Sequence, residues 1–153
     1  MKIWTPIKIL LIIVASIGAI FDSSYSEVGD KIGWEVAIAG LLFFPCIVAV
    51  GLFVLKLLLR KKLDFEVPSM TSNPLDFSHP EHFFHLGGLI MVVSGMCGLA
   101  ASYFRTGYLL PVTFAPVAIG TGVLLGIWGV KAVYFVQQSS NKSNQQGPSA
   151  GTR

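Results

Sequence analysis

The sequence predicts an all-α integral membrane protein, a four-helix transmembrane bundle with both termini in the cytoplasm. The 153-residue chain contains four long apolar runs, at residues 4–21, 34–59, 83–104 and 109–135, and none carries a charge near its middle. At ~1.5 Å per residue, each run can cross or nearly cross a hydrocarbon layer of ~30 Å. Few residues are charged, and most lysines and arginines fall on one side of the runs.

The composition excludes several classes of function. A soluble domain carries about 25% charged residues, roughly twice the 12% found in this chain. The formal net charge is +3, and no basic stripe lies on a water-soluble face, so we expect no nucleic-acid partner. No nucleophile-elbow, zinc-protease, phosphate-loop or dinucleotide-binding motif occurs. We therefore expect no enzyme activity and no cofactor.

The loops predict the orientation of the chain. Nine of the eleven Lys and Arg residues flank one side of the runs, and only Lys31 and Arg105 flank the other. Loops rich in Lys and Arg stay in the cytoplasm, which places both termini and the connection between the second and third runs there. We expect a multi-pass protein of the bacterial inner (plasma) membrane.

The first run has two interpretations. Lys2 and Lys8 followed by an apolar stretch also fit the basic and apolar regions of a cleaved signal peptide. If Lys8 extends its charged end to the interface, the run is long enough to span, and this length favours a retained helix. Cleavage would leave three helices.

The chain is expected to contain two regions. Residues 1–136 form the transmembrane domain. Residues 137–153 are rich in Ser, Asn, Gln and Gly and contain almost no apolar side chains. Such a segment cannot bury enough surface to offset the entropy of ordering, so we expect a disordered cytoplasmic tail.

Small residues recur at helical spacing in the third and fourth runs. In a bilayer such residues let helix backbones approach closely. A short turn joins the two runs, so we expect them to form the tightest pair, with a homodimer face as the alternative. The candidate packing residues are Gly88, Ser94, Gly95, Gly98, Ser102, Ala118, Gly122 and Gly126.

The segment before the third run has the most chemical character. His79, His82 and His85 recur every three residues, close to Asp76 and Glu81. Imidazole and carboxylate groups can bind a metal, and one histidine can bind haem. Histidines at a membrane edge can also sense pH or a partner.

A simpler interpretation of this segment is the start of a helix. Ser78 and Glu81 have the spacing of a capping box, and Pro80 suits the first helical turn. Glu81 and His85 would then form a polar pair one turn apart. We favour this interpretation over a metal or haem site.

A basic cluster follows the second run. Its residues are Lys56, Arg60, Lys61 and Lys62. Such clusters usually set the topology. They also contact anionic lipid at the interface, where each basic residue contributes about 1 kcal/mol.

These observations favour a membrane accessory, assembly or immunity-type component that has no catalysis of its own and acts through helix packing with a membrane partner. Its expected partners are the lipid bilayer and either a second membrane protein or further copies of the chain. One alternative is a metal- or haem-binding membrane subunit that uses His79, His82 and His85. Another is a small oligomeric pore or uncoupled carrier.

Overall fold

Four long helices account for most of the chain. The computed structural model describes residues 3–21, 27–59, 65–109 and 111–145. Within them the elements are α1 (Trp4–Phe21), α2 (Glu27–Leu58), α3 (Pro80–Thr106), a 3-10 turn η1 (Pro111–Thr113) and α4 (Phe114–Gln145). Each long helix has a segment with the length and composition to cross a membrane. The all-helical prediction is therefore confirmed, with four helices able to span a bilayer.

The helix boundaries differ most from the predicted ones at the start of α2 and at both ends of α4, which begins at Phe114 rather than at residue 109. The predicted first helix, residues 4–21, matches α1, but α2 begins at Glu27 rather than at residue 34. The gap between the first two predicted runs, residues 22–33, implied an external loop, but residues 27–33 are helical. Extending an existing helix requires no new nucleation step, which is why a polar stretch without proline can continue it. The rest of that expected loop, residues 22–26, lies outside the described residues.

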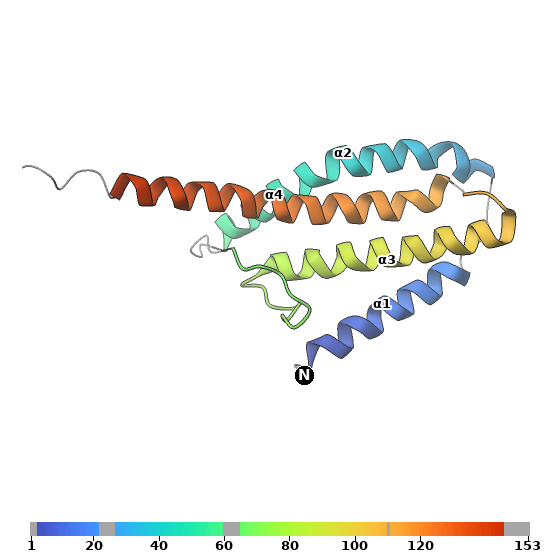
Figure 1. Ribbon diagram of the computed structural model, residues 1–153, viewed down its shortest axis with the longest axis horizontal. Coiled ribbons are helices and arrows are strands. Elements are labelled where there is room, and N and C mark those ends of the chain that lie inside the picture. Colours follow the sequence, from blue (N-terminus) through green and yellow to red (C-terminus); the bar gives the residue numbers. More distant parts are fainter. Residues whose placement is uncertain (1–2, 22–26, 60–64, 110, 146–153) are drawn as a thin grey trace, which may run out of the picture.

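The end of α4 also differs from expectation. The helix continues to Gln145, so residues 137–145, predicted to be disordered, belong to it. Gln and Lys are good helix formers, and the apolar part of α4 supplies the nucleus from which the helix extends. Residues 146–153 lie outside the described residues. In Figure 1 the last turns of α4 extend beyond the ends of the other helices.

The helices lie side by side in the order α2, α4, α3, α1 (Figure 1). α3 runs antiparallel to α4, whereas α2 runs parallel to α4 and α1 runs parallel to α3. In the part of the chain that the structure describes, α1 contacts α3 but neither α2 nor α4. Residues 65–79, which we call the connection, cover the end where α2 stops and α3 begins. We call this the connection end of the bundle.

The turn after α3 depends on one glycine. Gly107 has a φ of 78°, and its N–H donates a 2.8 Å hydrogen bond to the Tyr103 carbonyl. This left-handed conformation is the usual end of a helix and favours glycine because it has no Cβ. The chain then enters η1 and reverses into α4.

The largest apolar cluster lies between α2 and α4. Its buried members are Val48, Leu52, Val123, Ile127 and Val130. Two glycines of α4 bring the backbones together, because a Cβ on Gly122 would lie 2.6 Å from the Gly40 carbonyl oxygen and one on Gly126 would lie 2.8 Å from the Pro45 carbonyl oxygen. This packing belongs to the close-approach class typical of membrane helices.

The predicted packing residues therefore serve three different helix pairs. We expected the small residues of α4 to face α3, but Gly122 and Gly126 face α2. On α3, Gly95 lies against Val117 of α4, with a would-be Cβ 2.7 Å from Val117 Cγ2. Gly98 faces α1 instead, near Ala19. Sequence spacing identified small residues, but which neighbour each one meets depends on the order of the helices.

The other predicted packing residues also lie in α3 and α4. A Cβ on Gly88 would meet the Leu124 side chain at 3.0 Å. Ser94 donates its hydroxyl to the Ile90 carbonyl of its own helix, Ser102 is buried, and Ala118 is half-buried. None of these facts requires a second copy of the chain.

The close approach at Gly122 can be tested by adding a single methyl group. Gly122→Ala should lower the free energy of unfolding by about 1–3 kcal/mol because the Cβ overlaps the α2 backbone. Gly129→Ala is the matched control on the same helix, since nothing lies within 4 Å of its would-be Cβ. It should stabilise by up to about 1 kcal/mol through helix propensity. Denaturant unfolding in detergent micelles measures both, and equal effects would contradict the packing described.

Candidate functional site

A buried ion pair joins α2 to α3 at the connection end. Lys56 Nζ lies 3.2 Å from Glu81 Oε1, and the two side chains are only 5% and 0% exposed. Lys56 is in the last turn of α2, and Glu81 is in the first turn of α3. Buried charges are destabilising unless they are paired and hydrogen-bonded, so each residue requires the other.

The same carboxylate oxygen also holds the connection. Glu81 Oε1 accepts a 3.2 Å hydrogen bond from the backbone N–H of Glu66. It also lies 3.3 Å from His79 Nδ1. One oxygen therefore ties together the end of α2, both ends of the connection and the start of α3.

Two histidines add to this cluster. The rings of His79 and His82 stack with centroids 5.3 Å apart. The Nε2 atom of each lies 3.5 Å from Glu66 Oε2. When the imidazoles are protonated, Glu66 can pair with both of them. We call Lys56, Glu66, His79, Glu81 and His82 the polar cluster.

An aromatic residue covers the lysine. Lys56 Nζ lies 4.9 Å from the centroid of the Phe65 ring, in a cation–π contact. Phe65 in turn stacks on Tyr134 of α4 at 6.1 Å. The first residue of the connection is thereby held between α2 and α4.

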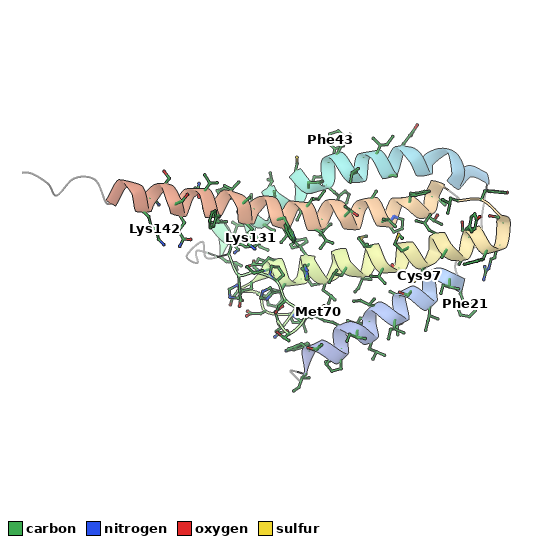
Figure 2. The ribbon with its side chains drawn as sticks, in the orientation of Figure 1. Phe21, Phe43, Met70, Cys97, Lys131 and Lys142 are labelled. Atoms are coloured by element: carbon green, nitrogen blue, oxygen red, sulfur yellow. The ribbon has the colours of Figure 1, made fainter. Side chains whose placement is uncertain are left out.

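A second lysine anchors the middle of the connection to α1. Lys8 Nζ donates hydrogen bonds to the Ser69 carbonyl at 2.9 Å and to Ser72 Oγ at 3.2 Å. Lys8 is 1% exposed, although it lies within the apolar run of α1. Figure 2 labels Met70, which lies where the connection reaches toward α1. These contacts favour α1 as an integral part of the fold.

Successive turns give the connection its own local structure. The Asn73 side chain accepts the backbone N–H of Leu75 at 2.9 Å, and the Asp76 side chain accepts that of Ser78 at 2.8 Å. Side chains of Asn and Asp commonly fix turns in this way. The connection is therefore ordered both by its own turns and by contacts to three helices.

The structure brings together only part of the predicted histidine site. His79, His82 and Glu81 lie in the polar cluster, whereas Asp76 fixes a turn and His85 lines a separate cavity beside α4. Within the described ranges, no group of three His, Cys, Asp or Glu residues is arranged to hold a metal ion. The metal and haem interpretations remain predictions.

The predicted capping box does not form. The residue that caps α3 is His79, and it makes no side-chain capping bond. Ser78 donates its N–H to Asp76, and Glu81 points toward Lys56 rather than back to Ser78. A long-range ion pair has replaced the local bond. Pro80 occupies the first turn of α3, as predicted.

The basic cluster after the second run is also divided. Lys56 is buried in the ion pair, so it is not placed to contact lipid headgroups. Arg60, Lys61 and Lys62 lie outside the described residues.

Sequence reasoning missed the roles of Lys8, Phe65 and Glu66. For Lys8 the signal was present, because a charge inside an apolar run requires a partner when the run enters a membrane. Phe65 and Glu66 carry no local pattern that indicates their contacts.

No known protein family, curated protein or solved structure matches this chain.

Paired substitutions can show whether the buried charges of Lys56 and Glu81 stabilise each other. Lys56→Met and Glu81→Leu should each lower the free energy of unfolding by about 3–5 kcal/mol, because each leaves an unpaired buried charge. The double variant should recover most of that loss, since neither charge remains. Denaturant unfolding of all four proteins measures the coupling. Additive single effects would show that the two side chains do not interact.

The anchor at Lys8 is tested by hydrogen exchange. Lys8→Met removes two hydrogen bonds from a charged donor, each contributing about 1.5–3 kcal/mol. Amides of residues 69–76 should then exchange about tenfold faster or more. Lys142→Met is the control, because Lys142 lies in the last turn of α4. Unchanged exchange in the Lys8 variant would contradict the anchoring contact.

Proposed function

We propose that this chain is a membrane-embedded accessory component, without catalysis of its own, that binds a membrane partner at the connection end. The observation that carries the proposal is an apolar cavity of about 300 Å³ at this end. The exposed side chains Leu75, Phe77 and Phe83 surround it. We call these three residues the docking surface.

The docking surface is apolar and strongly exposed. Phe77 is 82% exposed, Leu75 is 62% exposed and Phe83 is 59% exposed. Leu55, Pro74 and Phe84 form the walls of the cavity between them. A pocket beside exposed aromatic side chains is the arrangement that anchors a partner's apolar side chain in protein interfaces.

The polar cluster holds this surface in one conformation. Phe83 belongs to α3, whose first turn carries Glu81, while Leu75 and Phe77 belong to the connection that Glu81 and Lys8 hold. Ordering a backbone costs about 1–2 kcal/mol per residue. A preordered surface removes that cost from binding, whereas contact with fluid lipid tails gains nothing from a fixed conformation. This difference favours a protein partner.

The small-residue stripes support the same location for the partner. Gly95, Gly122 and Gly126 already pack against helices of this chain, so they are not available as a seam for a second protein. The exposed side chains of the docking surface leave it accessible to a partner.

The proposal includes an orientation. The excess of Lys and Arg at the connection end favours a cytoplasmic location for the docking surface and for both termini. We propose the bacterial inner membrane as the site of action, with a partner that presents an apolar side chain near the cytoplasmic face.

The experiment compares complexes extracted gently from the native membrane. Native mass spectrometry of the tagged wild-type chain should show a second protein at fixed stoichiometry. Phe77→Ala should lose it, because removing a buried aromatic anchor weakens binding by about 2 kcal/mol or more, or about 30-fold. Phe43→Ala should retain it. Phe43 is 63% exposed and projects from the outer side of α2 in Figure 2.

Four results would contradict the proposal. A bare chain, or a complex that Phe77→Ala leaves intact, would exclude binding at the docking surface. An added mass of a metal or haem that His79→Ala and His82→Ala remove would support the metal-binding alternative instead. A homo-oligomer without a second protein would direct attention to the pore alternative, which solute flux into liposomes then tests.

A further inference from the structure

A separate hollow lies where the start of the connection meets α4. It consists of two cavities of about 420 and 80 Å³ that share Phe65 and Lys131. Tyr134, Gln137, Gln138 and Asn141 line the larger cavity. His85, Ile127 and Trp128 line the smaller one. We call the two cavities together the α4 hollow.

One face of α4 supplies most of this lining. Residues 127, 131, 134, 138 and 141 follow one another at alternating spacings of four and three, which places them on one side of a helix. The stacking of Phe65 on Tyr134 holds the connection beside this face. The hollow is therefore bounded by elements whose positions the fold already determines.

Polarity changes along the hollow in the direction of α4. Ile127 and Trp128 are apolar, Lys131 follows them, and the amides of Gln137, Gln138 and Asn141 come last. The apolar part of α4 ends at residue 136. The hollow thus lies where α4 leaves its apolar segment, the depth at which Trp and Lys side chains meet lipid headgroups.

The charge of the hollow is positive. Lys131 is exposed, with Nζ 5.9 Å from the centroid of the Trp128 ring, and it forms no ion pair with any residue in the described ranges. His85 lines the smaller cavity and supplies an imidazole N–H that can donate a hydrogen bond. None of the described residues that line either cavity is an Asp or a Glu.

We propose that the α4 hollow binds the headgroup of an anionic phospholipid. Lys131 and His85 bind the phosphate, and the amides of Gln137, Gln138 and Asn141 hydrogen-bond to headgroup hydroxyls. Basic pockets between helices on the cytoplasmic side bind such headgroups. This site is separate from the docking surface and does not depend on the proposed partner.

The source of the phosphate is a lipid rather than a soluble ion. Trp128 is 70% exposed and lines the smaller cavity. It is on the apolar side of Lys131 along α4, so an acyl chain attached to the bound phosphate would lie against its ring. A free phosphate ion gains nothing from this apolar surface. A phospholipid contacts the polar lining of the hollow with its headgroup and the apolar surface with its acyl chain.

The test is lipid titration of the delipidated full chain, followed by native mass spectrometry. Phosphatidylglycerol is the probe, because its headgroup carries a phosphate and two hydroxyls, and phosphatidylcholine is the neutral comparison. We expect saturable binding of one phosphatidylglycerol, about tenfold tighter than phosphatidylcholine. Lys131→Gln should abolish that preference. Lys142→Gln removes the same charge about 16 Å further along the helix and should retain it. Both lysines are labelled in Figure 2.

Three outcomes would overturn the proposal. Equal binding of the two lipids, or equal losses in the two lysine variants, would show that the chain responds only to general surface charge. If inorganic phosphate binds as tightly as phosphatidylglycerol and displaces it completely, the site belongs to a soluble phosphate instead. Thermal unfolding of both variants checks that each retains its fold.

Discussion

The ion pair between Lys56 and Glu81 is the contact on which the connection end depends. It places two opposite charges in a region that offers them almost no water. The arrangement is stable only because Glu81 also accepts the Glu66 N–H, while Phe65 covers the lysine. The contacts with Glu81 all involve its Oε1, whereas its Oε2 is buried and has no hydrogen-bond partner in the described part of the chain. The position of the connection therefore follows from the need to satisfy one buried pair.

Both proposed surfaces derive from this placement. Leu75 and Phe77 of the connection belong to the docking surface, and Phe65 lines the α4 hollow. The polar cluster and Lys8 hold the connection in place. A partner protein and a lipid headgroup would thus bind to different parts of one ordered segment. The close helix contacts at Gly95, Gly122 and Gly126 are all made within the chain.

The sequence was sufficient to predict the helices but not their neighbours. Run length and hydropathy identified four helices, and for α1 they gave its bounds, because the hydrocarbon thickness sets the length of an apolar segment. The same reasoning could not assign Gly122 to α2, since spacing along one helix does not specify which helix lies opposite. The predicted end of α4 was also too early. The prediction used the polar composition of the tail and did not consider that the preceding helix can extend into it.

The candidate site shows the same limit. The spacing of Ser78 and Glu81 indicated a capping box, and the three histidines indicated a possible shared site. Glu81 instead pairs with a residue at the end of another helix, and His85 faces α4. A buried charge is stable only when an opposite charge offsets its desolvation cost. The tertiary fold determines which residue lies close enough to do so. For Lys8 the sequence carried a signal, since a charge within an apolar run requires a partner, but the prediction extended its charged end to the interface instead.

The most direct test of this account is the distance between Lys56 and Glu81 in a lipid bilayer. Solid-state NMR can measure the dipolar coupling between ¹⁵Nζ of lysine and the side-chain carboxyl carbon of glutamate in the labelled protein. The account predicts a strong coupling, consistent with the 3.2 Å separation of Nζ and Oε1, which disappears in Lys56→Met. Absence of that coupling in the wild-type chain, or its persistence in the variant, would contradict the pair and the ordered connection that rests on it.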